Sequence, residues 1–114
     1  MQRTYKAYLE DIIAAIGKIN EYAKGLSFED LARDSKTLDA VIRNLEIIGE
    51  AAKKIPDKVR DKYPAIEWKK ICGLRDILIH EYFGIDVVII WDVIQSKLPV
   101  LEAQATAMLK EQKQ

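Results

Sequence analysis

The chain has 114 residues, of which 49% are hydrophobic and 32% are charged, and its 18 lysines and arginines balance 18 aspartates and glutamates. This length and composition predict a single domain over residues 1–114 with one continuous core, and they argue against disorder. A zero net charge gives no overall positive field of the kind that marks many nucleic-acid-binding proteins. One cysteine allows no internal disulfide, and no apolar run approaches membrane-spanning length, so we expect a cytoplasmic protein without membrane contact.

Hydrophobic residues recur at three- and four-residue steps along most of the chain, which is the pattern of amphipathic helices. The helices predicted in this way span residues 3–24, 36–54, 57–63, 66–83 and 87–108. Gly25 is expected to end the first helix in left-handed backbone, Ser27 to cap a short turn, and Asp86 to cap the last helix. Because no stretch alternates convincingly at period two, the predicted fold class is all-α, an antiparallel bundle of four to five helices.

Two residues inside these helices require a physical reason. Gly49 costs roughly 1 kcal/mol relative to alanine in a helix interior, so we interpret it as a site of close approach by another helix or chain. Pro99 cannot donate a helical hydrogen bond, and it predicts either a kink or the start of a second helical segment.

A polar cluster interrupts the hydrophobic pattern of residues 66–83. It consists of Arg75, Asp76, Tyr82 and His80, the only histidine in the chain. Asp76 and His80 are i,i+4 neighbours on a helix, so the carboxylate can orient the imidazole and leave its other nitrogen free for proton transfer. Arg75 and His80 lie about 140° apart around one helix. Either the helix distorts near His80, or a twofold dimer brings one chain's arginine to the other's histidine.

These residue types suit the metal-free cleavage of RNA. A guanidinium such as that of Arg75 binds phosphate through paired hydrogen bonds, and an imidazole such as that of His80 transfers protons near neutral pH. Residues 53–75 also carry eight basic and three acidic side chains, and within them Lys69 and Lys70 are candidate RNA-binding residues. No Cys/His cluster has the spacing of a zinc site, and we expect neither a metal nor another cofactor.

Structural roles are an alternative for each of these residues. A lone histidine on a helix is more often structural than catalytic, and Arg75 beside Asp76 could form only a surface ion pair. Tyr82 could be a core ring with its hydroxyl at the rim, and the basic run could be a solvated face.

The pattern Arg75-x4-His80-x-Tyr82 resembles the signature of HEPN-domain proteins, specifically the HepT-like toxins of prokaryotic toxin–antitoxin pairs. The surrounding sequence that shares the resemblance spans residues 45–54, 68–71, 73–75 and 78–86. The resemblance implies an all-helical HEPN-like domain that forms a homodimer, in which Arg75 and His80 of both copies line one cleft. One departure is Asp76, because many relatives have asparagine there.

The implied activity is that of a metal-independent RNA endonuclease, the toxin of a type VII-like toxin–antitoxin system. The implied partner is an MntA-like nucleotidyltransferase antitoxin, which transfers AMP from ATP to the motif tyrosine, here Tyr82. The added phosphate and adenine would place charge and bulk where an RNA phosphate should bind. A different class of function also stays open, namely a non-catalytic subunit that binds substrate or nucleotide for a nucleotidyltransferase.

Overall fold

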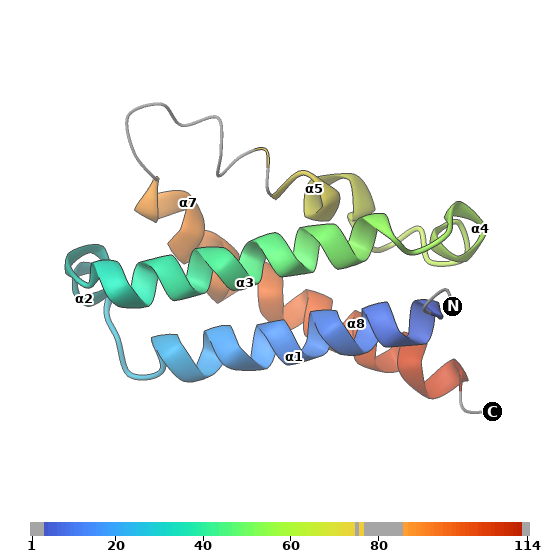
Figure 1. Ribbon diagram of the computed structural model, residues 1–114, viewed down its shortest axis with the longest axis horizontal. Helices are drawn as coiled ribbons and strands as arrows, with labels where there is room; N and C mark the ends of the chain where they lie inside the picture. The colour runs from blue at the N-terminus through green and yellow to red at the C-terminus, as the bar shows by residue number, and fades with distance from the viewer. Residues whose placement is uncertain (1–3, 75, 77–85, 113–114) are drawn as a thin grey trace.

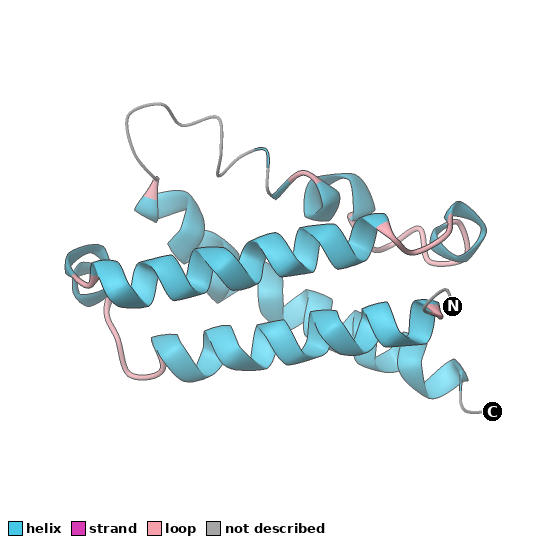
Figure 2. Ribbon diagram, viewed as in Figure 1, coloured by secondary structure: helices cyan, strands magenta, loops and turns pink. Residues whose placement is uncertain are grey.

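The structure, a computed structural model, describes residues 4–74, 76 and 86–112, and the regular elements in these ranges are all helical (Figures 1 and 2). They are α1 (Tyr5–Ala23), α2 (Phe28–Arg33), α3 (Ser35–Lys53), α4 (Asp57–Arg60), α5 (Trp68–Cys72), α7 (Val87–Asp92), the π-helix η1 (Val93–Lys97) and α8 (Leu98–Gln112). The predicted all-α class is confirmed, whereas the extent of one domain over residues 1–114 stays a prediction. Within the described ranges, we find no helix whose length and apolar content would suit a bilayer crossing.

The hydrophobic core lies between α1, α3 and the η1–α8 segment. α1 and α3 lie side by side and run antiparallel, with α8 crossing behind them (Figure 1). Inward-facing aliphatic side chains from these helices, each at most 5% exposed, include Leu9, Ile12, Ile16, Ile19, Val41, Leu45, Ile48, Ile94, Leu98, Leu101 and Met108. Burial of one such side chain contributes roughly 1.5–3 kcal/mol. The hydrophobic stripes of the sequence are therefore the contacts that hold the long helices together.

The connection from α1 to α3 follows the predicted caps. Gly25 has a φ of 78°, the left-handed conformation expected of it. The Ser27 hydroxyl accepts a hydrogen bond from the Asp30 amide, and the Asp30 carboxylate accepts one from the Ser27 amide, both at 3.1 Å. Asp34, a cap that the sequence analysis did not identify, accepts from the Thr37 amide at the start of α3 (3.0 Å). These side-chain caps satisfy backbone donors that a helix start would otherwise leave unpaired.

The last helical stripe is divided into α7, η1 and α8. Asp86 caps α7 as predicted, because its carboxylate accepts hydrogen bonds from the amides of Val88 (3.0 Å) and Ile89 (3.3 Å). Pro99 lies in the first turn of α8 and begins a second segment, one of its two predicted effects. The wider π turn of η1 directly precedes it, where an α-helix would press the carbonyl of Gln95 against the proline ring.

The helix predicted over residues 66–83 is wrong in two places. α5 begins later than expected, because the Ile66 amide donates to the Tyr63 carbonyl (3.1 Å) in a turn that precedes the helix. α5 then ends at the residue before Gly73, which is its C-cap. A Cβ at position 73 would lie only 3.2 Å from the Lys69 carbonyl oxygen, so this turn is tight enough to favour glycine. The final residues of the predicted helix lie outside the described ranges.

Candidate active site

The predicted site residues divide into two groups. Arg75, His80 and Tyr82 lie outside the residues that the structure describes, so their predicted convergence stays a prediction. Asp76 is described and exposed. Lys69 and Lys70, on α5, are also exposed.

The two lysines of α5 differ in their electrostatic surroundings. Lys70 Nζ lies 2.8 Å from Glu67 Oε2. This hydrogen-bonded ion pair raises the pKa of Lys70 and lowers the pKa of Glu67. Lys69 makes no ion pair with any residue in the described ranges. Lys69 therefore has the ammonium group that is more available to an external anion.

The loop before α5 is fixed to the C-terminal half of α8. The Tyr63 hydroxyl donates to the Glu111 carboxylate, a hydrogen bond that raises the pKa of Tyr63 to about 12. The Gln104 side-chain amide donates to the Ala65 carbonyl (3.4 Å). The Trp68 indole in turn donates to the Tyr63 carbonyl (3.2 Å), which connects α5 to the same loop. These contacts determine where α5 lies against α8.

Cys72, the last residue of α5, contacts Arg60 of α4. An Arg60 guanidinium nitrogen, Nη1, donates to Cys72 Sγ at 3.6 Å, and the same side chain pairs with Asp57. Burial raises the pKa of the Cys72 thiol, and the nearby Arg60 charge only partly opposes that effect. Cys72 is thus half-buried and predominantly protonated near neutral pH. Arg60, predicted only as part of a basic run, takes part in packing α4 against α5.

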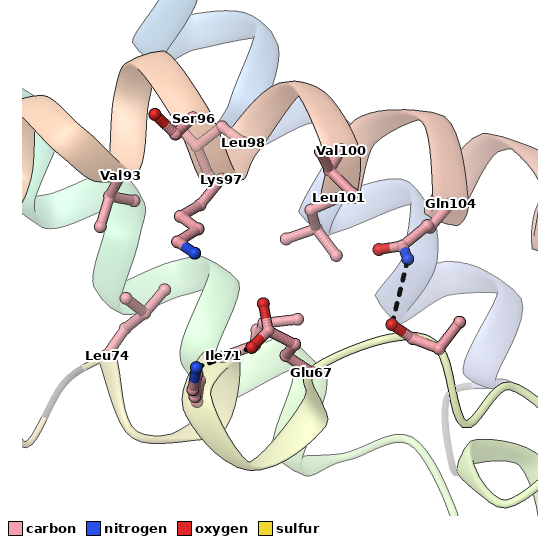
Figure 3. Close-up of a pocket in the computed structure, with 12 residues that line it drawn as sticks. Glu67, Ile71, Leu74, Val93, Ser96, Lys97, Leu98, Val100, Leu101 and Gln104 are labelled. Atoms are coloured by element: carbon pink, nitrogen blue, oxygen red, sulfur yellow. Dashed lines mark hydrogen bonds and ion pairs between the residues drawn. The ribbon is translucent and has the colours of Figure 1, made fainter.

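An open groove of about 420 Å³ lies between α5 and the η1–α8 segment (Figure 3). Its walls are mainly aliphatic and include Ile71, Leu74, Val93, Leu98, Val100 and Leu101. Leu74 projects from one wall, while Val93 and Leu101 project toward it from the other (Figure 3). Val100 beside them is 56% exposed. The sequence did not predict this groove, and the signal it offers is Val100, an apolar residue directly after Pro99 in the helix predicted over residues 87–108.

Charged side chains border the groove. Lys70 of α5 and Glu67, which precedes that helix, belong to the lining. Lys97 extends from η1 into the space between the walls (Figure 3). The Lys70 hydrogen bond is the main cause of the lowered Glu67 pKa, and the Lys97 charge lowers it further. Among the described residues, the lining thus contains two lysines and one glutamate, an excess of one positive charge. In the described part of the chain, no cluster of three or more His, Cys, Asp or Glu residues forms a metal site.

Comparison with known proteins places this chain among ribonuclease-like sequences. Residues 12–108 match the family described as "Ribonuclease HepT-like". The chain belongs to the HepT-like family. A protein of Caldanaerobacter subterraneus subsp. tengcongensis named "Putative RNase" is 44% identical over 97% of this chain and 99% of its own length. "Probable ribonuclease HepT" of Thermococcus cleftensis is 44% identical over 96% of this chain and all of its own length.

The HepT-like match covers both the helical core and the predicted catalytic segment. Residues 12–108 include Arg75, Asp76, His80 and Tyr82 as well as the lysines of α5. The family resemblance predicted from the sequence is therefore confirmed. No solved structure shows a significant match to this chain.

Proposed function

We propose that this HepT-like chain is a ribonuclease. The observation that carries the proposal is the family match over residues 12–108, which includes the predicted catalytic segment. Two full-length relatives whose printed names are those of ribonucleases support it. The Arg75-x4-His80-x-Tyr82 pattern supplies the residues through which the activity would operate.

In the proposed reaction the chain cleaves RNA without a metal ion. His80 accepts the proton of a ribose 2′-hydroxyl, whose oxygen attacks the adjacent phosphorus and displaces the 5′-oxygen of the next nucleotide. The imidazolium of His80, from the same or the partner chain, returns a proton to that leaving oxygen. Arg75 stabilises the negative charge that develops on the phosphate oxygens. The products are a 2′,3′-cyclic phosphate and a 5′-hydroxyl.

The remaining predicted residues assist Arg75 and His80. Asp76 orients His80 through the i,i+4 spacing, and Tyr82 forms part of the site wall. Lys69 and Lys70 bind RNA phosphates beside the site, with Lys69 the stronger contributor because Lys70 is paired with Glu67. A homodimer supplies Arg75 and His80 from both copies to one cleft, because a twofold interface places the same residues opposite each other.

We further propose that the ribonuclease is the toxin of a type VII-like toxin–antitoxin system. Its antitoxin would be an MntA-like nucleotidyltransferase that transfers AMP to the Tyr82 hydroxyl. The added phosphodiester is anionic and the adenosine is bulky, so the modification would repel RNA phosphate and block access to His80. Mass spectrometry of Tyr82 after incubation with the antitoxin and ATP tests this step. If the antitoxin inhibits the chain while Tyr82 stays unmodified, AMP transfer to Tyr82 is excluded.

RNA cleavage in EDTA tests the catalytic proposal. Wild-type protein should leave 2′,3′-cyclic phosphate ends, while Arg75→Ala and His80→Ala should each remove activity without lowering the melting temperature. Lys18→Ala, at an exposed position on α1, is the control that should cleave normally. If the Arg75→Ala and His80→Ala variants are mixed, a dimer can form from one chain of each kind. A site shared between its two chains then keeps one intact Arg75 and one intact His80, and it should regain activity. Cleavage that survives in His80→Ala would refute the assignment.

A non-catalytic subunit for a nucleotidyltransferase is the second candidate. The observations that favour it are the zero net charge and the internal pairing of Lys70, since a general RNA-binding protein is usually more basic. If the wild type cleaves no RNA but co-purifies with a nucleotidyltransferase, and His80→Ala leaves that enzyme fully active, this candidate replaces the ribonuclease.

A further inference from the structure

We propose that the groove between α5 and the η1–α8 segment is a subsite for one nucleobase of single-stranded RNA. The inference rests on the proposed ribonuclease function, and it adds a specific surface that holds a nucleotide flanking the cleaved bond. A groove of about 420 Å³ with mainly apolar walls and a few polar groups has the size and composition of a small-molecule binding site.

The groove offers a nucleobase apolar contact on both sides. Single-stranded RNA can turn its bases outward, and each base has two flat apolar faces. Leu74 and Ile71 come from the α5 side, while Val93, Val100 and Leu101 come from the opposite wall (Figure 3). Because these side chains are aliphatic, contact with a base face depends on burial of apolar area and should tolerate any base sequence.

Polar groups at the rim suit the rest of a nucleotide. Lys97 extends into the space between the walls, where its ammonium group can bind a backbone phosphate (Figure 3). Glu67, the one acidic residue among the described residues of the lining, has its charge offset by Lys70 at 2.8 Å. The Gln104 amide nitrogen is held by the Ala65 carbonyl, which leaves its carbonyl oxygen oriented to accept from the amino group of a base.

Chain connectivity places this groove beside the predicted catalytic segment. Leu74 lines one end of the groove and is bonded directly to Arg75. Consecutive Cα atoms are roughly 3.8 Å apart, so a groove residue directly precedes the first residue of the predicted catalytic pattern. A base held in the groove would therefore belong to a nucleotide near the scissile phosphate. Binding energy from such a flanking nucleotide can be used to position the reacting one.

Binding to a short single-stranded 2′-O-methyl oligonucleotide tests the subsite, because that RNA cannot be cleaved by its own 2′-hydroxyl. Val100→Asp should weaken binding about tenfold, because it replaces an apolar contact with a carboxylate that also repels RNA phosphate. Val88→Asp is the matched control, because Val88 is also exposed (64%) but does not line the groove. Lys97→Ala should lower the slope of log Kd against log salt by about 0.7, and Lys110→Ala should not.

An oligonucleotide with one abasic position in its centre completes the test. The abasic probe should bind wild type more weakly than the intact probe, while Val100→Asp should bind both probes equally, because its groove no longer holds the base. Equal losses for Val88→Asp and Val100→Asp would overturn the proposal. So would a change in sedimentation mass for Val100→Asp with unchanged RNA affinity, which would assign the groove to a second copy of the chain. A wild type that cleaves no RNA yet shows the predicted binding pattern would refute the proposed function alone.

Discussion

The ion pair between Lys70 and Glu67 makes adjacent lysines of α5 unequal in RNA binding. With Lys70 Nζ at 2.8 Å from the Glu67 carboxylate, the pair adds no net charge, whereas Lys69 has no partner in the described ranges. Each phosphate that a protein neutralises on a single strand contributes about 0.7 to the slope of log Kd against log salt. A fourfold increase in salt should therefore cost about 2.6-fold in affinity for each such contact.

Three variants separate the two lysines, with fluorescence anisotropy of an uncleavable single-stranded RNA as the measurement. Lys69→Gln should reduce the salt slope by about 0.7. The double variant Glu67→Gln with Lys70→Gln keeps the net charge and should leave the slope unchanged. Glu67→Gln alone releases the Lys70 ammonium and should increase the slope by a similar amount. The reasoning fails if the double variant loses as much as Lys69→Gln, or if Glu67→Gln has no effect.

Further predictions concern stability and titration. Gly25→Ala should destabilise the chain by roughly 1–2 kcal/mol in urea unfolding, because φ is 78° there. Gly17→Ala, in open space within α1, should instead stabilise it by roughly 0.5–1 kcal/mol. The hydrogen bond to Glu111 raises the pKa of Tyr63 to about 12, so its contribution to stability is complete below its unfolded pKa and is lost as pH rises toward 12. Ultraviolet titration should show an ionisation step near pH 12, and Tyr63→Phe should remove that step. The midpoint for alkylation of Cys72 by iodoacetamide should lie above the usual thiol pKa, because burial raises it, and a midpoint at or below that value would contradict the assignment.

The sequence predicted those features that arise from local physics. The three- and four-residue periods of α1 and α3 correspond to buried faces, and Gly25, Ser27 and Asp86 act at the turns as expected. Each of these depends on residues within a few positions, so a single sequence is sufficient. The same holds for the Glu67–Lys70 pair, whose i,i+3 spacing is visible in the sequence.

Among the features that the sequence did not predict, the caps at Asp34 and Gly73 are local, and the others depend on contacts between distant segments. The apolar stripe continues through Gly73, so periodicity alone predicted one helix where the structure has a C-cap. The Tyr63–Glu111 hydrogen bond joins residues 48 positions apart. The groove requires α5 and α8 to face each other across it, which neither helix specifies alone. For the candidate site itself, Asp76 is exposed, and the joint geometry of Arg75 and His80 stays a prediction.

The basic run over residues 53–75 shows why a count of charges overstates an electrostatic field. Three of its eight basic side chains are paired with the acid three residues before them: Lys53 with Glu50, Arg60 with Asp57, and Lys70 with Glu67. Residues i and i+3 are neighbours on a helix surface, so such ion pairs form readily. Each pair reduces the long-range attraction of the chain for a polyanion. If RNA is the substrate, affinity must then depend on a few available lysines together with short-range apolar contact. That combination predicts a smaller salt slope than eight phosphate contacts would give, with Lys69 and Lys97 among its contributors.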